Sequence, residues 1–230
     1  MKLGFIGTGN IVSDVVIGIC KSRIPFKKII VSPRNKQKAL KLKNKFKKVI
    51  IAKDNQDVIN KSDWVFLGVL PEVGKKILPQ LNFKNKQIIV SFISTINYSQ
   101  LKKIVKKKLR IVRAIPMPPI RLGRGPVAIF PPDKKVKNFF NKIGSTIEIK
   151  NEKLSINFWS TSGMMASYYE ILNVMSTWLI KKGIKRSDAQ KYITTLFLAL
   201  SEDAVVNSKK DLKYLVKESQ TPKGLNEQGL

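Results

Sequence analysis

Two glycines near the start of the chain, Gly7 and Gly9, constrain the fold more than any other feature. An apolar run at residues 2–6 leads directly into them, and apolar residues resume at helical spacing over residues 10–21. Gly7 suits a tight turn from strand to helix, and Gly9 lets the backbone come close to a ligand. The first amides of the helix carry partial positive charge, which favours a pyrophosphate. The pattern therefore predicts a dinucleotide-binding turn made by Gly7, Thr8, Gly9, Asn10 and Ile11.

The end of the next expected strand indicates which dinucleotide is bound. NAD-binding domains usually carry an acidic residue at this point, about 20 residues beyond the glycines, to hold the ribose hydroxyls. This chain has Arg34 instead, with Ser32 and Asn35 beside it. A guanidinium with small polar neighbours suits the 2′-phosphate of NADPH. We therefore expect Ser32, Arg34 and Asn35 to bind NADPH, with NADH as the alternative cofactor.

Short apolar segments alternate with polar or helical segments through the first two thirds of the chain. The expected strands are residues 2–6, 29–32, 49–52, 64–69, 87–92 and 110–115, and helices are expected at 10–21 and 35–47. This rhythm predicts a parallel sheet with helices on both faces. We expect a doubly wound α/β fold of the Rossmann type over residues 1–150.

From about residue 153 the pattern becomes purely helical. Apolar residues follow helical spacing from Met165 to Leu179, and Gly183 is expected to end that helix. Ser187 and Gln190 suggest a capping box for the next helix. Residues 151–230 are therefore expected to form a small all-helical domain. Its apolar faces exceed what about 80 residues usually bury alone, so we expect a homodimer or higher homo-oligomer through this domain.

Composition narrows the functional classes. The formal net charge is +29, but the lysines are spread along the whole chain and no arginine-rich arm or nucleic-acid-binding motif accompanies them, so a nucleic-acid partner is disfavoured. With no histidine and a single cysteine, the chain has no histidine triad and no Cys/His metal site. No apolar stretch approaches the roughly 20 residues of a membrane-spanning helix, and no secretion signal is evident. A cytoplasmic location is expected.

Five motifs occur in an order that resembles a known family. GFIGTGN, DWVFLGVLP, IVRAIP, STSG and TPKG follow one another as in pyrroline-5-carboxylate reductase, over nearly the whole chain. The resemblance implies NAD(P)H-dependent reduction of 1-pyrroline-5-carboxylate to proline, the last step of proline biosynthesis. It also implies that the cofactor is contacted on its nicotinamide side by the loop Val69, Leu70 and Pro71.

The substrate site is expected to supply donors to a carboxylate. On the family's pattern these donors are Ser162 and Gly163 near the start of the long helix, and Thr221, Gly224 and Asn226 near the C-terminus. A helix cap at the first position and an ordinary loop at the second are the structural alternatives. No catalytic side chain is assigned, because the imine nitrogen can take its proton from water.

The chain departs from the family at several of these motifs. Met117 stands where an asparagine is typical, and Lys223, Leu225 and Asn226 stand where the family has a glycine and two threonines. The sequence also ends before the last helices usual in the family. These departures leave open a related reductase of another small anionic imine or carbonyl acid. A third alternative is a non-catalytic nucleotide-sensing or nucleic-acid-associated protein that keeps the fold.

Overall fold

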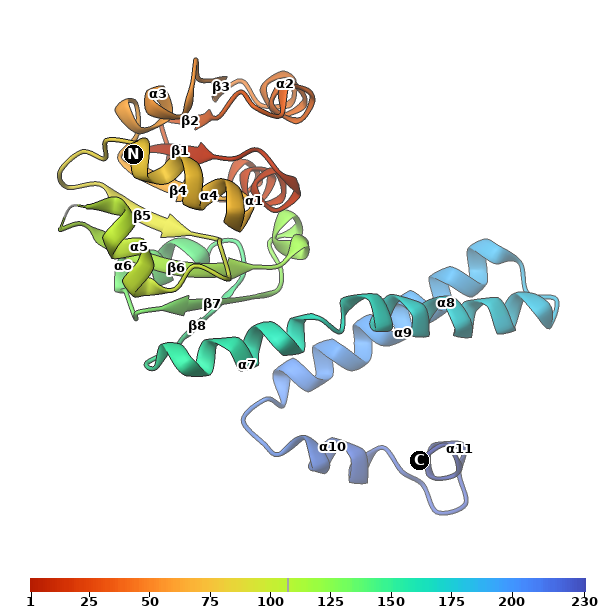
Figure 1. Ribbon diagram of the computed structural model, residues 1–230. Coiled ribbons are helices and arrows are strands. Elements are labelled where there is room, and N and C mark those ends of the chain that lie inside the picture. The colour runs from red at the N-terminus through yellow and green to blue at the C-terminus, as the bar shows by residue number, and fades with distance from the viewer. Residues whose placement is uncertain (107) are drawn as a thin grey trace. The chain divides into compact units, whose positions relative to one another are not determined.

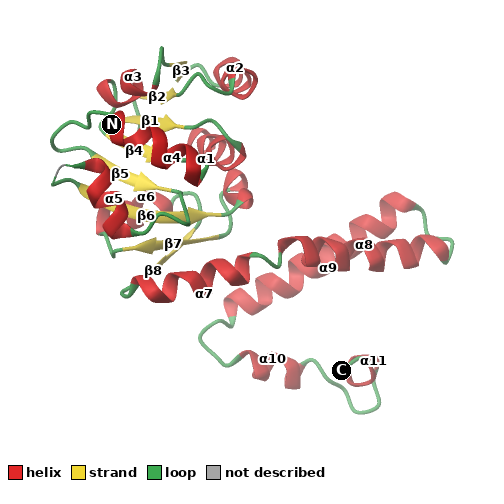
Figure 2. Ribbon diagram, viewed as in Figure 1, coloured by secondary structure: helices red, strands yellow, loops and turns green. Residues whose placement is uncertain are grey.

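The computed structural model describes residues 1–106 and 108–230, which form two compact units, Met1–Ser162 and Gly163–Leu230. The first unit contains a sheet covered by helices, and the second is helical (Figures 1 and 2). Helix α7 (Glu152–Ser162), which follows the expected domain boundary at residue 150, groups with the first unit. The functional division at residues 150 and 151 stays a prediction.

Within the described residues, the first unit has one eight-stranded sheet in the order β3-β2-β1-β4-β5-β6-β7-β8. Neighbouring strands pair in parallel except β6 and β7, which are antiparallel. The strands are β1 (Lys2–Ile6), β2 (Lys28–Val31), β3 (Val49–Ile51), β4 (Trp64–Leu67), β5 (Ile88–Ser91), β6 (Arg110–Pro116), β7 (Pro126–Phe130) and β8 (Ser145–Glu148). The order of the first six strands is that of a dinucleotide-binding domain, so the predicted fold class is confirmed.

Helices cover both faces of this sheet because successive strand residues point to opposite sides. Phe5 belongs to one buried cluster, together with Val12 and Val15 of the first helix, whereas its neighbour Ile6 belongs to a second cluster. The helical elements are α1 (Asn10–Lys21), α2 (Lys36–Lys45), α3 (Asn55–Asn60), α4 (Pro71–Ile77), η1 (Leu78–Gln80), α5 (Tyr98–Val105), η2 (Pro118–Leu122), α6 (Lys134–Phe140) and α7.

The expected elements of the first unit differ from the observed ones mainly at their ends. The helix expected at residues 35–47 is observed at Lys36–Lys45: the side chain of Asn35 caps its start, and the extended backbone of Phe46 ends it. The segment Gly123–Gly125 forms a turn, with φ of +72° at Gly123 and +100° at Gly125, and it leads into the antiparallel strand β7. Strands β7 and β8 extend the sheet beyond the six strands expected from the sequence.

Helix α1 packs closely on the sheet although its third fingerprint position carries Val12 in place of glycine or alanine. Val12 is fully buried, and a Cβ built on Gly68, which directly follows β4, would lie 2.2 Å from Val12 Cγ2. Gly68 therefore provides the space that the Val12 side chain fills. The helix therefore still packs closely on the sheet, but the small residue that permits it is Gly68, in the loop after the neighbouring strand β4, and not a residue of the helix.

This pairing predicts a specific result for substitution of Gly68. We expect Gly68→Ala to lower the free energy of unfolding by about 1–3 kcal/mol, because the added methyl overpacks a filled core. The double variant Gly68→Ala/Val12→Ala should be less destabilised than the sum of its single variants, since Val12→Ala makes room for the new methyl and the methyl fills part of the space that Val12→Ala leaves. Urea unfolding of the four proteins measures this coupling. Simple additivity would contradict it.

The second unit consists of α8 (Met165–Lys181), α9 (Arg186–Val206), α10 (Leu212–Glu218) and α11 (Leu225–Gln228). Helix α8 ends at Lys181, and the glycine predicted to terminate it, Gly183, follows with a φ of +91° and an amide that donates to the carbonyl of Ile180. The predicted capping box is wrong. Helix α9 has Lys185 at its N-cap and no side-chain cap, and Ser187 instead contacts the carboxylate of Asp188.

Candidate active site

The turn between β1 and α1 is built around the two glycines for different reasons. Gly7 has a φ of +93°, and a Cβ there would lie 2.5 Å from the carbonyl oxygen of Gly68. Glycine is therefore required at position 7 by the fold of the protein, whether or not a ligand is bound. Gly9 is the N-cap of α1, has no side-chain cap and a φ of −80°, and a Cβ there would meet no protein atom within 4 Å. A side chain at Gly9 would enter open space in front of the helix N-terminus, where an anion is favoured.

Ser32 ties this turn to the end of β2. Its Oγ accepts a hydrogen bond from the Gly7 amide at 2.9 Å, and its carbonyl accepts one from Thr8 Oγ1 at 2.8 Å. Thr8 and Ser32 are both buried. The structure therefore places Ser32 beneath the turn, where it positions Gly7 and Thr8. A contact between Ser32 and the cofactor stays a prediction.

A cavity of about 780 Å³ opens in front of this turn. Every residue predicted to contact the cofactor lines it, apart from Ser32. Its walls come from the ends of β1, β2, β4 and β5 and from the segments that follow them. The lining residues are Gly7, Thr8, Gly9, Asn10, Ile11, Arg34, Asn35, Lys36, Gly68, Val69, Leu70, Pro71, Val73, Phe92, Ile93 and Ser94. The volume is in the range of ordinary small-molecule sites.

The sheet order determines which residues lie at each end of this cavity. Arg34 and Lys36 follow β2 on one side of the glycine turn, whereas Val69 follows β4 and Ser94 follows β5 on the other. A dinucleotide with its pyrophosphate at the turn would place its 2′-phosphate near Arg34 and its nicotinamide near β4 and β5. The open space at Gly9, the helix N-terminus and the two cations together fit NADPH.

Several lining residues were not predicted from the sequence. Lys36 adds a cation beside Arg34, and Lys38 Nζ donates to Asn10 Oδ1, which brings a further cation close to the glycine turn. Residues 92–94 also enter the cavity wall. They could have been found from the rule that ligands bind beyond the carboxyl ends of parallel strands, since the expected strand at 87–92 ends there.

The predicted substrate residues lie at chain turns. Ser162 is the last residue of α7 and donates to the Phe158 carbonyl at 3.0 Å, and Gly163 is in the turn before α8. Helix α8 begins only at Met165, so these two residues precede the long helix. That each is a donor to substrate stays a prediction.

The remaining three predicted residues lie close together in the second unit. Thr221 and Gly224 belong to the loop between α10 and α11, where the Gly224 amide donates to the Thr221 carbonyl at 2.7 Å. Asn226 is in α11, and its side-chain amide donates to the Ser219 carbonyl at 2.8 Å. Asn226 therefore stabilises the fold of its own loop. A role of this loop in carboxylate binding stays a prediction.

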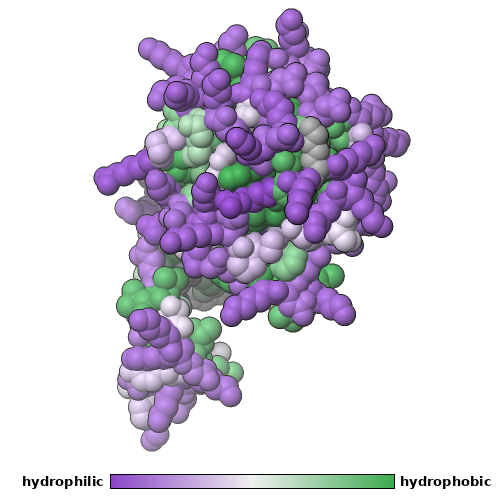
Figure 3. All heavy atoms as spheres, turned by 90° about the vertical axis from the view of Figure 1, so that its left-hand side faces the viewer, coloured by the Kyte–Doolittle hydropathy of each residue, from purple (hydrophilic) through white to green (hydrophobic). Residues whose placement is uncertain are grey.

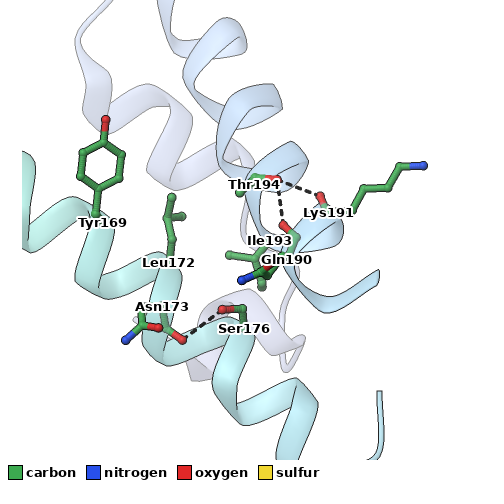
Figure 4. A pocket seen from close by; sticks show the side chains of 8 residues that line it. All are labelled: Tyr169, Leu172, Asn173, Ser176, Gln190, Lys191, Ile193 and Thr194. Atoms are coloured by element: carbon green, nitrogen blue, oxygen red, sulfur yellow. Dashed lines mark hydrogen bonds between the residues drawn. The ribbon is translucent and has the colours of Figure 1, made fainter. Parts of the chain in front are cut away.

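A smaller cavity of about 360 Å³ lies between α8 and α9, and Figure 4 shows its lining side chains. Ser176 donates to the Asn173 carbonyl, and Thr194 donates to the Gln190 and Lys191 carbonyls, so these hydroxyls are bound within their own helices. The ammonium of Lys191 points away from the other lining side chains in Figure 4. This cavity offers no chemistry comparable to that of the glycine turn.

The described residues hold no cluster of three or more side chains suited to a metal ion. Burial raises the pKa of Cys20 to about 11, so its thiol is protonated near neutral pH and is not a nucleophile. None of the helices in the described part of the chain is long and apolar enough to cross a membrane.

The fold and this cavity define a dinucleotide-binding domain, and the similarity to known proteins identifies an NAD(P)H-dependent oxidoreductase. A family described as NADP oxidoreductase, coenzyme F420-dependent, matches residues 2–95. The pyrroline-5-carboxylate reductase of Vibrio alginolyticus is 26% identical over 234 residues, which covers 97% of this chain and 85% of that protein. The resemblance to the pyrroline-5-carboxylate reductases that the motifs indicate is thereby confirmed along nearly the whole chain.

Solved structures show the same fold. The 1-pyrroline-5-carboxylate reductase of Streptococcus pyogenes matches with a TM-score of 0.82 and 24% identity, covering 100% of this chain and 88% of that one. The pyrroline carboxylate reductase of Plasmodium falciparum, solved with NADP bound, matches with a TM-score of 0.83 and 21% identity, covering 100% and 87%. Both units of this chain are therefore present in a reductase structure that holds NADP.

Proposed function

We propose that this protein reduces 1-pyrroline-5-carboxylate to proline with NADPH. The observation that carries the proposal is the Gly7–Gly9 turn, which opens on a cavity with cations at one end and the ends of β4 and β5 at the other. This cavity occurs in a chain that is similar to pyrroline-5-carboxylate reductases over nearly its whole length. A cytoplasmic location is part of the same proposal.

The chain's own residues bind and orient the reactants. The amides at the start of α1 hold the pyrophosphate, and Arg34 with Lys36 holds the 2′-phosphate. Val69 and Ser94 border the nicotinamide end of the cavity. NADPH supplies the hydride when it is bound. The protein needs no histidine for this reaction, because an imine nitrogen can be protonated by water and the site contributes mainly position and charge.

The substrate carboxylate is proposed to accept hydrogen bonds from two short segments. These donors are Ser162, Gly163, Thr221, Gly224 and Asn226. Ser162 ends α7 and Gly163 follows it in the turn before α8, whereas Gly224 is the N-cap of α11 without a side-chain cap, where the first amides of a helix favour an anion. Lys223, with a φ of +58°, adds a cation in the same loop.

A homodimer or higher homo-oligomer through the second unit is also proposed. Its helices bury few side chains among themselves and expose a set of large apolar ones that water would otherwise cover. This set is Tyr169, Ile171, Val174, Met175, Trp178, Tyr192, Leu198, Leu200, Val205 and Val206. In contrast, hydrophilic side chains cover most of the face of the first unit seen in Figure 3. Sedimentation equilibrium of the purified protein tests the oligomeric state.

A second candidate function is reduction of another small anionic imine or carbonyl acid. Met117, at the N-cap of η2, replaces a polar side chain with an apolar one, and Leu225 does the same in the C-terminal loop. These changes remove hydrogen-bond partners that a site specific for one substrate would use. They leave the cofactor cavity unaffected.

The decisive experiment follows the absorbance of NADPH with pyrroline-5-carboxylate present and absent, with NADH in parallel. We expect oxidation that requires the imine and is faster with NADPH. Tight NADPH binding without turnover would contradict the proposed substrate and favour the second candidate, which other cyclic imines and keto acids would then test. Complementation of a proline auxotroph provides an independent check in the cell.

A further inference from the structure

We infer that Arg113 is a positioning residue that holds the loop after β5, residues 92–95, against the nicotinamide end of the cavity. The inference rests on the proposed use of a nicotinamide cofactor and assigns a new role within that site. Arg113 does not line the cofactor cavity. It acts through Ser94, which does.

The first observation is the set of contacts that the guanidinium makes. Arg113 lies on β6 with a side chain that is only 2% exposed. One terminal nitrogen donates to the carbonyl of Ser94, and the other forms an ion pair with Glu152 Oε1. The same Glu152 oxygen accepts the amide of Tyr98, the first residue of α5, at 2.7 Å. Arg113 and Glu152 therefore connect the middle of the segment between β5 and α5, at Ser94, to the start of α5.

The second observation is that helix α7 encloses this charge. The guanidinium carbon lies 4.4 Å from the ring centroid of Trp159, and both Glu152 and Trp159 belong to α7, within the first unit. Burial lowers the pKa of Arg113, and the neighbouring Glu152 opposes that shift, so the side chain stays charged. A buried ion pair contributes little net stability, which makes a positional role the better account of its presence.

The third observation is where the anchored loop lies. Phe92, Ile93 and Ser94 line the cavity beside the residues that follow β4, on the side of the glycine turn away from Arg34. Binding of the part of a ligand that lies at Arg34 or at the glycine turn does not depend on this loop. Loss of the Arg113 anchor should therefore weaken contacts to the nicotinamide half of the cofactor and leave the phosphoadenosine half unchanged.

Two ligands distinguish binding of the nicotinamide half of the cofactor from binding of its phosphoadenosine half. We propose to titrate the parent protein and Arg113→Met by calorimetry with NADP⁺ and with 2′-phospho-ADP-ribose, which lacks the nicotinamide. Arg113→Met should weaken NADP⁺ binding on the order of tenfold, because the loop that borders the nicotinamide loses its charged hydrogen bond, and should change 2′-phospho-ADP-ribose binding by less than about twofold. Arg113→Lys, which keeps the charge and a donor, should recover part of the NADP⁺ affinity.

Matched variants keep the test decisive. Arg110→Met is the control, because Arg110 is on the same strand but is exposed and pairs with Asp133 instead. It should bind both ligands like the parent. If Arg113→Met does not fold, Glu152→Gln retains an acceptor for Tyr98 and removes the ion pair, and it should show the same split with a smaller change. Equal weakening of both ligands, or of neither, would overturn the inference. Neither outcome depends on the substrate, so the proposed reduction is tested separately.

Discussion

Gly9→Ala is expected to weaken NADPH binding about 100-fold or more while the protein stays folded. The added methyl would enter the open space in front of α1, where the pyrophosphate must approach the backbone. No protein atom lies within 4 Å of that methyl position, and the φ of −80° suits alanine. The free energy of unfolding should fall by no more than about 1 kcal/mol, the usual difference between these residues at an N-cap.

Gly7→Ala is the matched comparison, and its main expected loss is in stability. Its methyl would lie 2.5 Å from the carbonyl oxygen of Gly68, at a φ of +93°. We expect a loss of about 2–4 kcal/mol of stability, from backbone strain and overpacking together. Thermal unfolding and calorimetric titration with NADPH measure both quantities for each variant. Parent-like NADPH affinity in Gly9→Ala would show that the pyrophosphate does not bind at this turn.

Arg34→Asp should reverse the cofactor preference. Arg34 lies at the end of the cavity beside Lys36, where the 2′-phosphate of NADPH would receive charge-assisted hydrogen bonds. Replacing the cation with a carboxylate removes these bonds, adds repulsion, and offers an acceptor to the ribose hydroxyls of NADH. We expect the ratio of NADPH to NADH affinity to fall by about 100-fold, which corresponds to roughly 3 kcal/mol.

The control for this charge reversal is Arg23→Asp. Arg23 is exposed and lies just beyond the C-terminal end of α1, opposite the end at which the cavity opens. Arg23→Asp should keep the parent's ratio of NADPH to NADH affinity, although it changes the net charge of the protein as much as Arg34→Asp does. A similar fall in both variants would mean that long-range charge, rather than a contact at Arg34, selects the cofactor. Competition titrations with NADP⁺ and NAD⁺ give the ratio directly.

The glycine turn and its helix were predicted from the sequence because their signals are local. An apolar strand, two glycines and helical spacing lie within 21 residues, and α1 is observed at the expected Asn10–Lys21. Arg34 and Asn35 were predicted for the same reason, since the end of β2 follows at a typical distance. Lys36 was not predicted, because no local pattern separates it from the other lysines of the chain. Ser94 was not predicted either, although its place just beyond the end of a parallel strand marks it as a candidate.

The sequence by itself determined the elements that hydrophobic periodicity and turn chemistry specify: the parallel strands, the Gly7–Gly9 turn and the end of α8 just before Gly183. Only the tertiary structure decided which distant residues meet. Val12 fits because Gly68 lies opposite it, and Arg113 reaches Glu152, 39 residues away, because α7 packs against β7, which pairs with β6. Spacing along a chain shows which face of an element is buried. It does not show which element covers that face, because long-range contacts form only when the whole unit folds.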